Sequence, residues 1–350
     1  MKRPNFLAAS AALSMAGPAT ASQPLHVRPE EGPHEATFMM WPASRKVHPE
    51  KAFLDILQHT IADIANAIAA FEPVIMLAAA FDQAPAKKLL SRDVTLWDVP
   101  AEDLWARDAS PLIAHKRSKR VVSHLEFYGW GNKQVHAHDG KVACAIADRL
   151  AFDPVESGFK GEAGGLEHDG HELLIAHESS WVNKNRNLGL SRDAIERRLL
   201  TAYGAKRMSW ADGVWGEDIT DYHIDSLALF TGAGRALINQ PDNPDWEDPF
   251  HAAAYETCDI LKIAGLELVV IPEPEYRRVK SIDFVASYAN FYACNGAVVV
   301  AKFGDRETDN IARTALARHN PGREIVTLNV DALGEVGGGI HCATQQLPSA

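Results

Sequence analysis

The sequence contains 350 residues, of which 46% are hydrophobic and 23% are charged, and its formal net charge is −11 at pH 7. This composition is typical of a soluble globular protein with enough apolar residues for one large domain or two small ones. The acidic charge argues against nucleic acid and anionic membrane surfaces as partners, because both carry negative charge. It mildly favours a cationic ligand.

The N-terminal residues are arranged as in a secretory signal peptide. Lys2 and Arg3 precede a mildly apolar run over residues 6–17, and Ala19-Thr20-Ala21 provides a small-x-small cleavage site. We therefore expect residues 1–21 to direct export to the periplasm or out of the cell. A cytoplasmic protein with a disordered N-terminal tail is the alternative. No apolar run in the chain is long enough to span a bilayer, so membrane insertion is not expected.

Apolar periodicity predicts helices and strands in alternation along the remaining chain. Helices are expected over residues 49–71, 140–150, 191–203, 249–264 and 306–319. Strands are expected in the apolar stretch that ends before Pro42 and over residues 74–79, 94–99, 121–127, 173–176, 266–271, 297–301 and 324–328. This alternation predicts an α/β protein, and by itself it favours a doubly wound sheet. Without a low-complexity linker or a shift in composition, residues 22–350 are expected to form one domain.

The C-terminal segment Gly337-Gly338-Gly339-Ile340-His341-Cys342 draws attention because three consecutive glycines cost backbone entropy and pack no side chain. Such a run lets the backbone approach a ligand closely and present the next side chains at a fixed angle. Cysteine is a strong nucleophile once it is deprotonated. Cys342 is therefore a candidate nucleophile, and a buried small hydrophobic residue is the alternative.

The other cysteines are Cys144, Cys258 and Cys294. Four cysteines are too few for a disulfide scaffold, and none of them forms a zinc-like Cys-x-x-Cys pair. One disulfide among these three remains open in an oxidising compartment. A catalytic Cys342 would have to stay unpaired.

Three internal segments contain acids and a histidine suited to a cationic substrate. Asp108 follows Trp105-Ala106-Arg107 at a turn before a strand, and an Arg–Asp surface turn is the alternative. Glu162 is the first residue of the segment Glu162-Ala163-Gly164-Gly165 and is a candidate site carboxylate. A loop carboxylate without a function is nearly as good an interpretation.

His223 and Asp225 are two residues apart in the third of these segments. In an extended chain they would point to the same face and converge on one site. A histidine that titrates near neutrality can act as proton donor and later as base. A metal site that recruits His136, His138 and His168 is the less favoured alternative, because no tight ligand triad accompanies the pair.

These segments resemble the motifs of the agmatine deiminase family, within the guanidino-group-modifying hydrolases that include bacterial peptidylarginine deiminases. The resemblance extends from about Arg28 to Pro348 and includes Ser287-Tyr288-Ala289-Asn290. It implies a five-bladed, pseudo-symmetric α/β propeller of ββαβ units around a central active-site channel. The chain departs from the family at three positions. Ser110 and Tyr222 stand where glycine is usual, and Leu229 replaces a common arginine.

The resemblance also implies a role for each candidate residue. Cys342 would attack the guanidinium carbon, Asp108 and Asp225 would hold its N–H groups, and His223 would donate and accept protons. Glu162 would orient His223; a competing alignment on Gly164-Gly165 loses this acid. Asn290 and Trp105 would contact the substrate. Asn183, Arg186 and Asn187 match a family stretch to which we assign a structural role.

The resulting prediction is a cysteine-dependent hydrolase that converts a guanidinium to a ureido group and ammonia, without a metal or organic cofactor. Agmatine is the expected substrate, giving N-carbamoylputrescine for putrescine biosynthesis. An arginine-bearing peptide, citrullinated by the same chemistry, is the alternative. A non-catalytic binding protein for guanidino ligands and a metal-assisted hydrolase are the rival predictions. The sequence leaves homo-oligomerisation open.

Overall fold

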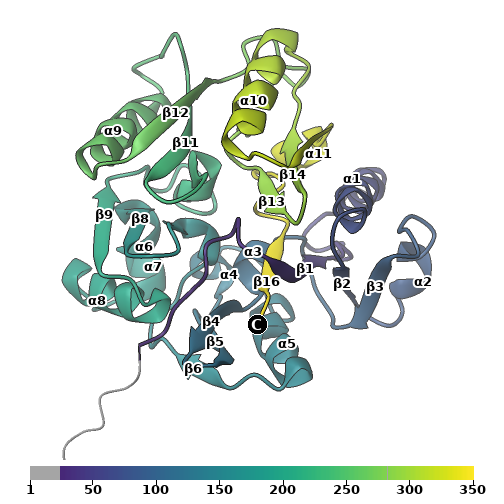
Figure 1. The fold of residues 1–350 in the computed structure, drawn as a ribbon. Coiled ribbons are helices and arrows are strands. Elements are labelled where there is room, and N and C mark those ends of the chain that lie inside the picture. Colours follow the sequence, from purple (N-terminus) through teal and green to yellow (C-terminus); the bar gives the residue numbers. More distant parts are fainter. Residues whose placement is uncertain (1–23, 282) are drawn as a thin grey trace, which may run out of the picture.

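Five small sheets are arranged around a common centre (Figure 1). The computed structural model describes residues 24–281 and 283–350, so the predicted export signal lies outside the described residues. The strands are β1 (His34–Met40), β2 (Val74–Ala78), β3 (Val94–Asp98), β4 (Leu112–Lys116), β5 (Lys119–His124), β6 (Pro154–Glu156), β7 (Leu166–His168), β8 (Leu173–His177), β9 (Arg207–Ala211), β10 (Ala228–Phe230), β11 (Arg235–Gln240), β12 (Glu267–Pro272), β13 (Tyr292–Cys294), β14 (Ala297–Ala301), β15 (Glu324–Leu328) and β16 (Gln345–Pro348).

Four of the sheets repeat one topology, β4-β5-β6, β7-β8-β9, β10-β11-β12 and β13-β14-β15. In each, the first two strands are antiparallel and the last two are parallel. A parallel pair needs a crossover connection, and a helix supplies it in every case. These helices are α5 (Val142–Leu150), α8 (Arg192–Tyr203), α9 (Pro249–Ile263) and α10 (Arg306–His319). The expected propeller of ββαβ units is confirmed, and the doubly wound sheet favoured by alternation alone is not formed.

The remaining sheet closes the ring with strands from both ends of the described chain. Its order is β16-β1-β2-β3, and helix α1 (Lys51–Ala69) connects β1 to β2. Strand β16 runs antiparallel to β1, with Phe38 opposite Gln345 and Ala36 opposite Leu347. Strand β16 lies near the centre of the ring (Figure 1), and Cys342 precedes its first residue, Gln345, by three positions, so the pairing that closes the ring also anchors the segment with the candidate nucleophile.

Apolar spacing and capping residues account for the predicted helices. The apolar positions Leu57, Ile61, Ile64 and Ile68 of α1 are buried, as their helical spacing predicts. Ser191 accepts a hydrogen bond from the backbone N–H of Ala194, which caps α8, and Gly204 ends this helix in the left-handed conformation. Asp305 caps α10 in the same way as Ser191 caps α8.

Short helical turns fill many of the connections. They are α2 (Gln83–Ala86), α3 (Ala106–Ala109), α4 (Gly129–Asn132), α6 (Glu178–Trp181), α7 (Lys184–Asn187), α11 (Asp331–Gly334) and the 3-10 helices η1 (Asp139–Lys141), η2 (Ala163–Gly165) and η3 (Ile224–Ser226). Three of these turns, α3, η2 and η3, carry or adjoin the predicted carboxylates. None of the helices in the described residues combines the length and apolar character needed to cross a membrane.

Candidate active site

Cys342 is half-buried in the turn between the glycine run and β16. Its Sγ accepts a hydrogen bond from Asn290 Nδ2 at 3.0 Å and lies 3.3 Å from Asp225 Oδ2. The Cys342 backbone N–H donates to Asn290 Oδ1 at 3.3 Å, and its carbonyl accepts from the Arg107 N–H at 3.0 Å. Cys342 is therefore held by groups from three separate parts of the chain, two of which contact its thiol.

The glycine run is required by close contacts. A β-carbon on Gly338 would lie 2.6 Å from the ring of Trp105, and one on Gly339 would lie 2.5 Å from Asn290 Oδ1. Gly337 has a φ of +91°, a conformation that side chains rarely adopt. Gly338 and Gly339 thus let the loop pass close to side chains of the site, and Gly337 allows the turn that precedes them.

Gly164 lies where three predicted site residues meet. A β-carbon at this position would approach Asp108 Oδ1 to 2.8 Å and both Asp225 Oδ2 and His223 Nδ1 to 3.0 Å. The Gly164 backbone N–H donates to Asp108 Oδ1 at 3.0 Å, and Trp130 Nε1 donates to Asp108 Oδ2 at 2.9 Å. All three ionisable side chains are buried.

His223 lies between two carboxylates. Its Nδ1 is 3.7 Å from Asp108 Oδ2, and its Nε2 is 3.5 Å from Glu162 Oε2. The extended segment predicted for His223 and Asp225 was wrong: His223 is extended but caps the 3-10 helix η3, which contains Asp225. The two side chains still meet at the site, because the tight turn brings both of them next to Gly164.

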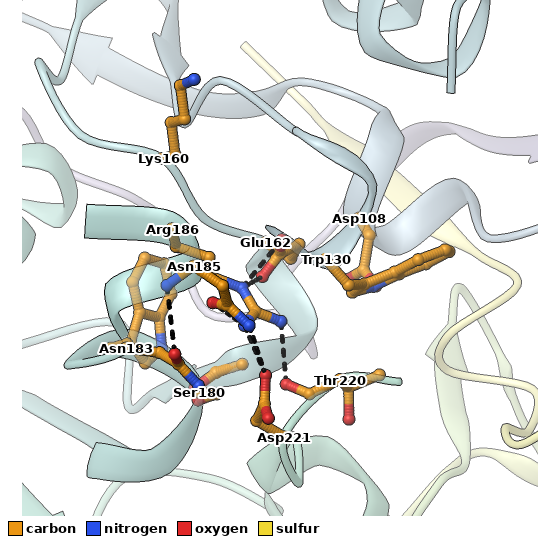
Figure 2. Close-up of polar contacts among 12 residues, drawn as sticks. Asp108, Trp130, Lys160, Glu162, Ser180, Asn183, Asn185, Arg186, Thr220 and Asp221 are labelled. Carbon is orange, nitrogen blue, oxygen red and sulfur yellow. Dashed lines mark hydrogen bonds and ion pairs between the residues drawn. The ribbon is translucent and has the colours of Figure 1, made fainter. Parts of the chain in front are cut away.

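Arg186 joins the Glu162 side of the site to the turn that precedes His223 (Figure 2). Its Nε donates to the Glu162 oxygens at 2.8 and 3.2 Å, Nη1 donates to Asp221 Oδ2 at 2.8 Å, and Nη2 donates to the Thr220 carbonyl at 2.9 Å. The side chains of Arg186, Glu162 and Asp221 are almost completely buried. A buried guanidinium with this many acceptors fixes the position of each of them.

The charges around the thiol determine how the site titrates. Burial, Asp225 and Asp108 raise the pKa of Cys342 well above its ordinary value, so the thiol is neutral at pH 7. Burial also raises the pKa of Asp108, to about 6. Burial opposes protonation of His223, but Asp108, Glu162 and Asp225 outweigh it and raise the pKa of His223 to about 9.

Asp225 has one engaged and one free carboxylate oxygen. Its Oδ2 receives His341 Nδ1 at 2.8 Å and the Cys342 thiol at 3.3 Å. Its Oδ1 is buried and has no hydrogen-bond partner among the described residues. Burial works against ionisation, yet the hydrogen bond and charge of His341 lower the pKa of Asp225. A buried, ionised oxygen without a donor is suited to receive the N–H of a cationic ligand.

Comparison with known proteins identifies the family. The family model for Porphyromonas-type peptidyl-arginine deiminases matches residues 26–348. The chain belongs to this family. The predicted class, a hydrolase acting on the C–N bond of a guanidino group, is thereby confirmed.

Several relatives of this deiminase cover nearly all of its length. A Streptomyces coelicolor protein with the provisional name agmatine deiminase is 30% identical over 334 residues, covering 91% of this chain and 98% of its own. A Porphyromonas gingivalis structure, provisionally named arginine deiminase, is 28% identical with a TM-score of 0.82 and covers 93% of this chain and 98% of that one. The agmatine deiminase of Enterococcus faecalis shares the fold at 22% identity, with a TM-score of 0.83 and coverage of 95% and 99%.

The deiminase fold brings the sequence-predicted site residues together. Those in direct contact or joined through Gly164 are Asp108, Glu162, His223, Asp225, Asn290 and Cys342. Trp105 lies behind the glycine run, with its ring against Gly338. Trp130, which donates to Asp108, was not predicted as a site residue. It lies between Gly129 and Gly131, a pattern that could have indicated a constrained turn, and both glycines have a positive φ.

The three departures from the family pattern have different surroundings. Tyr222 adopts a φ of +62°, a conformation that favours glycine, and its ring stacks on His177 at 4.7 Å between centroids. Leu229 is buried in β10. Ser110 is buried, and its hydroxyl has no partner among the described residues. The Tyr222 ring is therefore part of the core beside His177.

All four cysteines lie in the described part of the chain, and none is paired. The disulfide left open among Cys144, Cys258 and Cys294 is therefore not formed. Among the described residues, no group of three or more His, Cys, Asp or Glu side chains is arranged to hold a metal ion.

Proposed function

We propose that this deiminase hydrolyses the guanidinium of agmatine to N-carbamoylputrescine and ammonia, with Cys342 as nucleophile. The observation that carries the proposal is the buried cluster at Gly164, where Asp108, Asp225 and His223 meet beside the thiol. A guanidinium is planar and stays protonated at physiological pH, so it needs carboxylates on its N–H edges and a nucleophile facing its carbon.

Asp108 and Asp225 bind the guanidinium in this proposal. The unpartnered Oδ1 of Asp225 accepts one N–H group. Asp108 already accepts from Gly164 and Trp130, but each carboxylate oxygen can accept two hydrogen bonds, so it retains capacity for the substrate. These interactions align the guanidinium carbon with Sγ, which converts the attack into a step within one complex.

The substrate itself activates the thiol. Burial is the main cause of the raised pKa of Cys342, and the negative charges of Asp225 and Asp108 raise it further. A bound guanidinium neutralises these two charges and so lowers the pKa of the thiol. Cys342 then gives its proton to bulk water, and the thiolate adds to the guanidinium carbon while the π electron pair of one C=N bond moves onto nitrogen, which gives a neutral tetrahedral intermediate. Asn290 Nδ2 stabilises the developing thiolate from 3.0 Å.

His223 supplies and then removes a proton. As the C–N bond breaks, protonated His223 gives its proton to the departing NH₂ group, which leaves as ammonia, and Cys342 carries a thiouronium. Neutral His223 next takes a proton from water, the hydroxide adds to the same carbon, and the C–S bond breaks. The products are the ureido compound and the Cys342 thiolate. The proton of the added hydroxide is taken up by ammonia, and the thiolate regains a proton from bulk water once the product has left.

Two names among the relatives point to different substrates. Curated relatives carry the provisional name agmatine deiminase, whereas the matching family is named for peptidyl-arginine. We favour the small amine, since curated relatives that are 30% identical to this chain carry that name. Peptidylarginine, converted by the same chemistry, is the alternative.

Ammonia release from agmatine, free arginine and a peptide with C-terminal arginine tests this choice, with Cys342→Ala as control. Turnover of agmatine alone supports the proposal. Turnover of the peptide alone replaces agmatine by peptidylarginine and keeps the chemistry. No release from any of the three by a folded protein would favour the non-catalytic binding protein.

The export signal predicted at residues 1–21 affects which of these substrates the protein meets. We propose that the mature chain acts outside the cytoplasm. Fractionation of cells that express the full chain, with and without residues 1–21, tests this. Recovery of both forms in the cytoplasm would contradict it.

A further inference from the structure

Residues 24–33, which we call the N-terminal strap, run over the ring toward its centre before β1 begins (Figure 1). His26 forms two backbone hydrogen bonds with His115 of β4, at 2.9 and 2.7 Å. The Val27 N–H then donates to the carbonyl of Tyr203, at the end of α8. The strap is thus anchored on two blades, and it brings Glu30 to the centre.

Glu30 contacts two residues that are sequence neighbours of the proposed catalytic groups. Its Oε2 accepts from Arg107 Nη2 at 2.7 Å and from His341 Nε2 at 2.9 Å. The partners are buried, whereas the Glu30 side chain is 16% exposed. Burial works against ionisation, but Arg107 and His341 together lower the pKa of Glu30, so this carboxylate is charged.

His341 is a buried bridge between Glu30 and Asp225. Its Nδ1 lies 2.8 Å from Asp225 Oδ2, opposite the Nε2 contact with Glu30. Glu167 lies 3.7 Å from the same Nε2. Burial and Arg107 oppose protonation, but Glu30 and Asp225 raise the pKa of His341 to about 9. A protonated imidazole donates from both nitrogens, so it can hold both carboxylates at once.

We infer that Glu30 and His341 are positioning residues for the guanidinium site. Glu30 fixes His341, and His341 holds Oδ2 of Asp225, which leaves Oδ1 directed at the substrate. This rests on the proposed role of Asp225 in binding the guanidinium. It gives the N-terminal strap a part in substrate affinity, although the strap itself makes no contact with the thiol.

Two substitutions of His341 separate its two contacts. His341→Asn places an amide N–H near the position of Nδ1, so it can still donate to Asp225 but cannot reach Glu30. His341→Gln places the amide near Nε2, so it keeps Glu30 and loses Asp225. We expect His341→Gln to weaken guanidinium binding by roughly tenfold to a hundredfold, the value of a charge-assisted hydrogen bond, and His341→Asn to weaken it less.

Glu30→Gln removes the charge and keeps the size of the side chain. We expect it to weaken binding about tenfold through the loosened His341. Glu31→Gln is the matched control, because Glu31 is the next residue of the strap and its side chain makes no hydrogen bond to Arg107 or His341. Adding Glu30→Gln to His341→Asn should not lower the affinity further, since His341→Asn has already removed the contact through which Glu30 acts.

The measurement is the affinity for methylguanidine and for agmatine in a Cys342→Ser background, by titration calorimetry or NMR, alongside the melting temperature. Methylguanidine contains little more than the guanidinium, so it tests how well Asp225 binds this group, independently of the aminobutyl chain of agmatine. Weaker binding by Glu30→Gln and normal binding by Glu31→Gln support the inference.

Normal ligand affinity in Glu30→Gln, whether or not its melting temperature falls, would overturn the inference. It would also be overturned if Glu30→Gln lowered the affinity of the His341→Asn protein as much as that of the protein with His341. The proposed function fails separately, namely if Cys342→Ser turns over agmatine at the wild-type rate.

Discussion

Gly164 and Asp108 are in direct contact at the centre of the site. The Gly164 N–H donates to Asp108 Oδ1 at 3.0 Å, and a β-carbon on Gly164 would lie only 2.8 Å from the same oxygen. The same β-carbon would press on Asp225 and His223. The absence of a side chain at this position is therefore a requirement of the site rather than of the turn, since its φ is not in the left-handed region.

Gly164→Ala should reduce kcat/KM at least about a hundredfold, because displacing reacting groups by even 1 Å has effects of that size. The fold should remain, since the added methyl group meets movable side chains. Gly140→Ala is the control: its β-carbon would make only ordinary contacts, at 3.4 Å or more. Steady-state kinetics and circular dichroism check both variants. A Gly164→Ala enzyme with normal kinetics would contradict the described site.

The pH dependence of kcat/KM should be bell-shaped. Asp108 must be ionised to bind the cation, and its pKa is raised to about 6, so activity should fall as the pH drops through that value. His223 must be protonated to release ammonia, and its pKa is raised to about 9, so activity should also fall as the pH rises through that value. His223→Gln should lose the alkaline limb along with most activity. A wild-type rate that keeps rising above pH 9 would be inconsistent with His223 as the acid.

Arg186→Met should destabilise the protein by about 3–5 kcal/mol, because it leaves Glu162 and Asp221 buried with one fewer partner. Chemical denaturation measures this loss. Arg235→Lys provides the comparison: Arg235 pairs with Glu267 at the surface, where an ion pair contributes little to stability, so only a small loss is expected. Equal stability losses in the two variants would show that the network in Figure 2 contributes no more to stability than an exposed ion pair.

Tyr222→Gly should destabilise the protein in spite of removing a strained conformation. Glycine at φ +62° relieves about 1–2 kcal/mol, but loss of the buried ring against His177 and Phe250 costs about 3–5 kcal/mol. Ala151→Gly, at φ +54° on an exposed helix end, should stabilise by up to about 1 kcal/mol because no packing is lost. Denaturant midpoints test both signs. A more stable Tyr222→Gly protein would mean that the ring contributes less than the strain.

Much of the fold could be predicted because its helices are amphipathic and its central strands are apolar. Strand β14, Ala297–Ala301, was predicted with its observed bounds since all five residues are apolar and buried. The first strands of three hairpins, β7, β10 and β13, were not predicted. Strands such as β7 and β10 have only three residues, and β16 contains two glutamines that pair inside the ring. Periodicity cannot be recognised over so few positions.

The site could be predicted as a set of residues but not as an arrangement. Cys342, His223 and the acids were found through motifs that resemble a known family, whereas their geometry depends on contacts between distant segments. His341 was visible next to Cys342, yet its bridge from Glu30 to Asp225 joins residues 311 and 116 positions away. No local pattern in the sequence reports such a bridge. Arg186 was expected to be structural, and its contacts with Glu162 and Thr220 agree with that expectation.

The central claim is that Cys342 attacks the guanidinium carbon, and the most direct test is mass spectrometry of enzyme quenched in acid during turnover of agmatine. We predict an adduct with the mass of the substrate minus ammonia, located on the peptide that contains Cys342 and absent from Cys342→Ala. Ammonia release by Cys342→Ala at the wild-type rate, with no adduct on the wild-type peptide, would contradict the account.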